Sequence, residues 1–328
     1  MLIGAVVAGV IAGYFLRTTT PRESTSAEPV SPPVPRRDLR PLGRPVFTKD
    51  LSEDSRKRLS DLEGLAAADP RKALNKLPAF RNTELLPMAL TALARGWALT
   101  DPSAAARWAA QLESSEEQVS AVLGLVPVWT ARNPEECLAW TSAQPAGDMR
   151  EVALVEVADA WVEKAPENAL ARFLSMEPET GTERGLHAIT AQWALDDPDK
   201  AIEQVAALPA EQRRDEFLET VLVSLTNQDP DRVWKEATRF DDPKRLEHVR
   251  AMSLEAMSET RPQVALNLAA SLGNPPELLK AVARGWASND AAAARAWIGT
   301  LQDPGLAETL KSQIDPPGAD ALPSQPAP

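Results

Sequence analysis

ARGWALTDPSAAARW, residues 94–108, holds the pattern on which the fold depends. A tryptophan stands five residues before a proline, and an aspartate directly precedes that proline. Asp followed by Pro is typical of a helix start, because the carboxylate accepts hydrogen bonds from free backbone N–H groups and proline at the first helical position loses none. The segment therefore predicts a junction between two helices. A close copy, ARGWASNDAAAARAW, occupies residues 283–297.

The same junction recurs along the chain with a period of 32 residues. Seven prolines mark it: Pro70, Pro102, Pro134, Pro166, Pro198, Pro230 and Pro262. An eighth junction, Asp290–Ala291, follows Pro262 after 29 residues, and we expect the missing three to come from the loop inside the hairpin. Within each period the apolar residues recur at helical spacing in two segments. The repeat unit is therefore expected to be a helical hairpin.

All nine tryptophans fall on repeat positions. We assign the five that stand five residues before a junction to the repeat core, because a bulky ring facing a small residue suits close helix packing: Trp97, Trp129, Trp161, Trp193 and Trp286. Three more stand six residues after a junction: Trp108, Trp140 and Trp297. Other units carry Lys76, Arg172 or Gln204 at that second position, so these three rings are expected to be half-exposed candidates for partner binding.

The chain is therefore expected to be all-α: a right-handed α-solenoid of about eight 32-residue hairpins over residues 46–314, preceded by one membrane helix. The repeat resembles the tetratricopeptide and HEAT-like families of helical hairpins. More narrowly, it resembles the Trp-Ala-x-x-Asp-Pro-x-x-Ala-x-x-Trp repeats of uncharacterised bacterial membrane-anchored proteins, over about 260 residues. Its period of 32 departs from the tetratricopeptide pattern. The resemblance implies that a protein or peptide binds on a concave face, and it carries over no ligand residues.

The N-terminal stretch MLIGAVVAGVIAGYFL has no charged side chain, so residues 1–17 are expected to be a membrane anchor, with residues 2–16 in the membrane. A cleaved signal peptide is the alternative, but the stretch lacks a basic start and an Ala-x-Ala site. Gly9 and Gly13 form a Gly-x-x-x-Gly pair, which in lipid lets two helices approach and so offers a surface for self-association.

Two segments are too poor in apolar residues and too rich in proline to fold. Residues 18–45 are expected to form a disordered stalk, and residues 315–328 a disordered tail. Because the arginines follow the apolar run, the positive-inside rule would keep the repeat domain in the cytoplasm. Against that, an N-terminal anchor followed by a Ser/Thr/Pro-rich stalk is a common way to hold a domain outside the inner membrane. We therefore expect a single-pass protein with an extracytoplasmic, periplasmic repeat domain.

The charge and residue types argue against nucleic acid as a partner and against chemistry. The net charge is −12, which repels phosphate backbones. The two histidines, His187 and His248, are 61 residues apart, and Cys137 takes a position that holds alanine in most other units. No phosphate-binding or catalytic motif occurs. We therefore expect no cofactor, no metal site and no enzymatic activity.

Arg95 and Arg284 occupy the same repeat position, beside Gly96 and Gly285. Each is expected either to pair with a nearby carboxylate or to anchor an acidic group of a partner. The hypothesis that fits best is a non-catalytic, membrane-tethered scaffold that binds a protein or peptide of unknown identity. The alternatives are an accessory subunit of an enzyme complex and a purely structural spacer.

Overall fold

The computed structural model describes residues 51–314, and every regular element in that range is a helix. The all-α prediction is confirmed for this part of the chain. The expected membrane helix, stalk and C-terminal tail, including Gly9 and Gly13, lie outside the described residues. Among the helices of residues 51–314, none is both long enough and apolar enough to span a bilayer.

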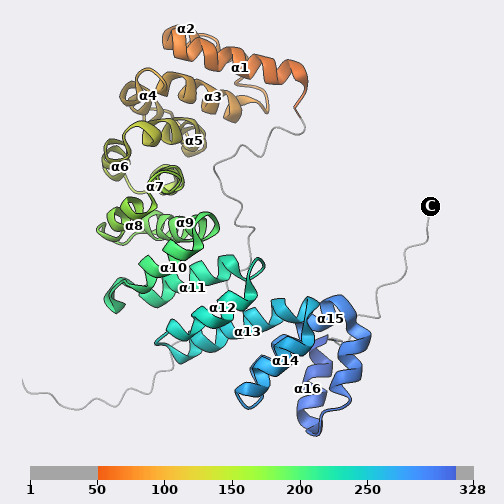
Figure 1. The fold of residues 1–328 in the computed structure, drawn as a ribbon. Helices are drawn as coiled ribbons and strands as arrows, with labels where there is room; N and C mark the ends of the chain where they lie inside the picture. The colour runs from red at the N-terminus through yellow and green to blue at the C-terminus, as the bar shows by residue number, and fades with distance from the viewer. Residues whose placement is uncertain (1–50, 315–328) are drawn as a thin grey trace, which may run out of the picture. The chain divides into compact units, whose positions relative to one another are not determined.

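Long and short helices alternate along the chain (Figure 1). The long helices are α1 (Glu53–Ala68), α3 (Leu86–Ala98), α5 (Ser115–Arg132), α7 (Asp148–Val162), α9 (Thr180–Asp196), α11 (Arg214–Leu225), α13 (Pro243–Thr260) and α15 (Pro276–Ile298). The short helices are α2 (Pro70–Leu74), α4 (Pro102–Ala109), α6 (Pro134–Ser142), α8 (Pro166–Leu174), α10 (Pro198–Ala206), α12 (Pro230–Glu236), α14 (Pro262–Ser271) and α16 (Pro304–Ile314). Three 3₁₀ turns are η1 (Leu77–Ala79), η2 (Ala210–Gln212) and η3 (Ala237–Arg239).

The seven repeat prolines each begin a short helix, as predicted. In five units the preceding side chain accepts a hydrogen bond from the backbone N–H three residues on: Asp69, Asp101, Asn133, Asp197 and Asp229. Ala165 and Arg261 take similar backbone angles without a side-chain cap. The backbone angles therefore follow the repeat even where the capping residue is missing.

The eighth junction lies inside α15, at Asp290. Its φ of −141° and ψ of 82° are not helical, and they match the −142° and 84° of the cap residue Asp101. Asp290 Oδ1 accepts a hydrogen bond from the Ala293 N–H at 2.9 Å. Two helices thus meet at Asp290, where the sequence predicted a new unit.

The sequence predicted that the three residues missing before that junction come from the loop. The helix bounds show that this prediction is wrong. The connection before α15, residues 272–275, is close in length to the connection before α7, residues 143–147. However, α15 begins ten residues before Trp286, whereas α7 begins thirteen residues before Trp161. The shortening therefore falls on the first turn of the long helix.

Packing follows the order of the chain. Each long helix packs on the next long helix, from α1 on α3 to α13 on α15. Each short helix from α2 to α14 packs on the long helices before and after it. The buried residues accordingly form successive clusters, and Trp97 and Trp108 pack against both the first and the second of them. The long helices therefore supply the continuous part of the core.

Glycines allow adjacent long helices to approach closely. A Cβ atom added at Gly96 would overlap the Glu63 carbonyl oxygen, and one at Gly285 would overlap the Glu255 carbonyl oxygen. At the equivalent position in α1, the first helix of the described residues, a Cβ at Gly64 would meet no atom of residues 51–314 within 4 Å. The glycines thus fix the spacing between two pairs of helices.

Candidate interaction surfaces

The tryptophans of the two repeat positions form pairs across three junctions. Trp97 pairs with Trp108, Trp129 with Trp140, and Trp286 with Trp297, at ring-centroid distances of 5.8, 5.7 and 5.8 Å. These distances are typical of offset or tilted aromatic pairs, which add about 0.5–1.5 kcal/mol beyond their burial.

Burial differs among these rings. Trp129, Trp161 and Trp193 are buried, whereas Trp97 and Trp286 are half-buried. The candidate partner-binding rings Trp108, Trp140 and Trp297 are each half-buried too. Because one face of each candidate ring packs on its paired tryptophan, only its outer part is open to a partner.

Arg95 and Arg284 each face a carboxylate of the preceding long helix. The Arg95 guanidinium lies 3.8 Å from Glu63, and the Arg284 guanidinium lies 2.7 Å from Glu255. All four side chains are about one third to two fifths exposed, so these ion pairs are screened by solvent and add little stability. The arginines therefore bridge adjacent hairpins, and an incoming acidic group would have to compete with a glutamate.

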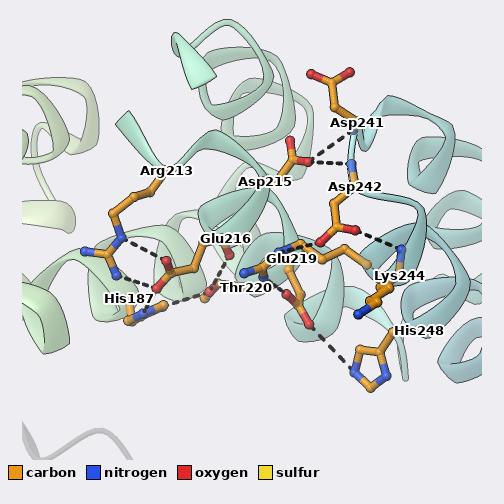
Figure 2. A network of polar contacts seen from close by, with 11 residues as sticks. His187, Arg213, Asp215, Glu216, Glu219, Thr220, Asp241, Asp242, Lys244 and His248 are labelled. Carbon is orange, nitrogen blue, oxygen red and sulfur yellow. Dashed lines mark hydrogen bonds and ion pairs between the residues drawn. The ribbon is translucent and has the colours of Figure 1, made fainter. Parts of the chain in front are cut away.

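A larger polar network crosses three long helices, α9, α11 and α13 (Figure 2). At its start, His187 of α9 lies 2.8 Å from the Thr220 hydroxyl and 3.1 Å from Glu216, both on α11. Arg213 pairs with Glu216 and with Glu183 of α9. The hydrogen bonds that Glu216 accepts from Arg213 lower the pKa of Glu216, and this carboxyl group is therefore charged at neutral pH.

The network continues from α11 to α13 through two further carboxylates (Figure 2). Asp215 accepts hydrogen bonds from the backbone N–H groups of Asp241 and Asp242, each at 3.1 Å. Burial would raise the pKa of Asp215, but the Asp242 amide and the Arg214 guanidinium lower it. Glu219 pairs with Arg245 and lies 3.7 Å from His248. The carboxylates of this network are thus held by cations and amides of the chain itself.

Two carboxyl groups on α7 do not belong to this network. Glu156 is 1% exposed, and within residues 51–314 its Oε1 atom has no hydrogen-bond partner. Burial, together with the nearby charge of Asp159, raises the pKa of Glu156 to about 8. Burial, together with the charge of Glu163, raises the pKa of Asp159 to about 6. Glu156 is therefore mostly protonated at neutral pH.

The single cysteine is placed among hydroxyl groups but is closed to solvent. Cys137 is fully buried, and burial raises the pKa of its thiol to about 12. The hydroxyls of Thr130 and Thr141 lie close enough to lower that pKa in part. A thiol in this state is a poor nucleophile at neutral pH.

An apolar patch lies at the C-terminal ends of the long helices α3 and α5. Leu99, at the end of α3, is 50% exposed. It lines a shallow hollow with Pro127, Val128 and Ala131 of α5, and Arg132 closes one edge. The Arg132 guanidinium is engaged with the C-terminal end of α3, where it donates to the Leu99 carbonyl at 2.7 Å. The patch therefore offers apolar contact beside a guanidinium that donates hydrogen bonds to backbone carbonyls.

Sequence reasoning did not single out Glu156, Asp159 or the apolar patch. A signal for Glu156 was present, because the equivalent positions one period before and after hold Gly124 and Ala188. This repeat position holds small residues in the two neighbouring units and lies on a helix face that touches the preceding helix. A glutamate there indicates a buried carboxyl group.

Within residues 51–314, no group of three or more His, Cys, Asp or Glu side chains is placed to hold a metal ion. Comparison with protein-family models, with curated proteins and with solved structures gives no match for this chain.

Proposed function

We propose that this protein is a non-catalytic, membrane-tethered scaffold that binds a protein or peptide on the surface of a right-handed α-solenoid. The observation that supports the proposal is the order of packing. Each long helix packs on its neighbours in sequence, so the chain builds a long surface from repeated units instead of one closed core. Proteins built in this way use that extended surface for binding.

The exposed features along this surface suit recognition of a polypeptide. These features are the half-buried tryptophans, the apolar patch around Leu99 and ion pairs between adjacent long helices, such as Arg284 with Glu255. Aromatic and apolar groups supply most of the free energy at protein interfaces, and charged groups set specificity.

The binding proposal is tested by photo-crosslinking in the cells that produce the protein. A photoreactive amino acid is placed at Ala131, in the apolar patch, and at Gln204, on α10. Matched controls carry it at Ala139 and Gln228, which are exposed and line neither the hollow at Ala131 nor a second hollow that Gln204 lines. We expect one discrete adduct at Ala131 or Gln204 and none at the controls. Equal labelling at all four positions would contradict the proposal.

The membrane part of the proposal concerns residues 2–16. We expect the full chain to stay in the membrane fraction after alkaline carbonate washing, and a chain without residues 2–16 to be released. Release of the full chain would contradict the tether while leaving the binding proposal intact.

A further inference from the structure

A hollow lies between two short helices, α8 and α10. Its volume is about 280 Å³, and it is lined from α8 by Leu170, Ala171 and Leu174, from α9 by Trp193, from α10 by Gln204, and by Leu208 in the connection after α10. Both short helices pack on α9 rather than closely on each other, which leaves the gap between them open.

The repeat explains why the hollow forms here. Trp193 stands five residues before its junction, and the position six after the junction holds Gln204 instead of tryptophan. In three other units a tryptophan at that second position lies 5.7–5.8 Å from the first ring. Gln204 is smaller and exposed, so the space that an indole fills elsewhere is left partly empty.

The lining also determines the charge of a suitable ligand. Among the described residues that line the hollow, Glu167 is the one charged side chain, and Ser175 and Gln212 add neutral polar groups. A carboxylate at the edge of an apolar hollow favours a cationic neighbour on the ligand and disfavours an anionic one. The net charge of the chain, −12, acts in the same direction.

We infer that this hollow is a binding site for an aromatic side chain of a partner polypeptide, carried next to a lysine or arginine. The aromatic ring takes the place of the absent second tryptophan beside Trp193, and the basic residue lies against Glu167. This inference rests on the proposed function. It deepens that function by naming the chemistry of the partner and the place where the partner binds.

The test uses the full chain in detergent micelles and three short peptides: acetyl-Trp-Arg-amide, acetyl-Ala-Arg-amide and acetyl-Trp-Glu-amide. Binding is followed through the indole N–H resonance of Trp193, which is assigned by its loss in Trp193→Phe. We expect the first peptide to shift this resonance saturably. The alanine peptide and the glutamate peptide should each bind about tenfold more weakly, since each lacks one of the two contacts.

Two variants fill the hollow from opposite walls. Gln204→Trp places an indole ring in the hollow from α10, next to Trp193, as in the paired units. Ala171→Phe places a phenyl ring in the hollow from α8. Both positions are exposed, so both variants are expected to fold. Each should abolish the peptide-induced shift. Glu167→Gln should reduce the preference for the arginine peptide over the glutamate peptide while leaving aromatic binding in place.

An unchanged shift in both filled variants would overturn the inference, as would equal binding of the tryptophan and alanine peptides. Those outcomes would leave the scaffold proposal standing if photo-crosslinking still gave a discrete adduct at Ala131. Loss of every discrete adduct would instead contradict the scaffold proposal itself.

Discussion

Glu156 shows how one residue can link the stability of this protein to pH. Its pKa is about 8 in the folded chain and near 4.5 in the unfolded chain. Between these values the folded chain holds a proton that the unfolded chain releases. The free energy of unfolding should therefore fall as the pH rises from about 4.5 to about 8, by an amount on the order of a few kcal/mol.

The substitution Glu156→Gln removes this titration while keeping the shape of the side chain. We expect the variant to lose much of the decline in stability between pH 5 and pH 8, as measured by urea denaturation at several pH values. Glu203→Gln is the matched control, because Glu203 is exposed on α10 and should leave the curve unchanged. Parallel curves for wild type and Glu156→Gln would show that the carboxyl group is not buried.

At the scale of the helix, glycine decides how closely neighbouring long helices pack. In Gly96→Ala the new methyl would overlap the Glu63 carbonyl, so α1 and α3 must separate. We expect a loss of about 1–3 kcal/mol in the free energy of unfolding. Gly64→Ala, at the equivalent position with no atom within 4 Å, should instead gain up to about 1 kcal/mol from helix propensity. Thermal denaturation measures both, and effects of the same sign would refute the role assigned to Gly96.

A second effect at the scale of the helix concerns the short helices α8 and α14, whose N-termini have no side-chain cap. Ala165 has φ −152° and ψ 69°, near the −151° and 86° of Asn133, but it offers no side-chain acceptor to α8. Ala165→Asn should therefore stabilise the protein by about 1 kcal/mol, and Asn133→Ala should destabilise it by a similar amount. Urea denaturation of both variants checks the prediction. A destabilised Ala165→Asn variant would contradict it.

The helix starts could be predicted from the sequence because they depend on local chemistry. A capping residue followed by proline gives the same junction in unit after unit, and even the unit without proline, at Asp290, keeps the backbone geometry. The pairing of Trp97 with Trp108 was not predicted, since it depends on the turn between two helices. The hollow beside Trp193 was missed for the same reason: an empty space is visible only once the neighbouring rings have positions.

At the scale of the molecule, packing between neighbours alone predicts which deletions the chain tolerates. Removing residues 134–165, one full period of 32 residues, should join two equivalent positions and leave a cooperatively folded, helical protein. Removing residues 134–149, half a period, deletes the short helix α6, so the long helix α7 would follow α5 directly, where a short helix must pack, and folding should be disrupted. Circular dichroism and the urea m-value distinguish the two, because the m-value follows the surface buried on folding. Equal behaviour of the two deletions would contradict a repeating core.

The order of packing also has a mechanical consequence. Because α3 packs on α1 and α5, its neighbours along the chain, a force that pulls the two ends apart loads the contacts between hairpins in series. Hairpins should then detach singly, and each 32-residue unit should lengthen the chain by roughly 110 Å at about 3.4 Å per extended residue. The protein should therefore extend in discrete steps under tension, one hairpin at a time.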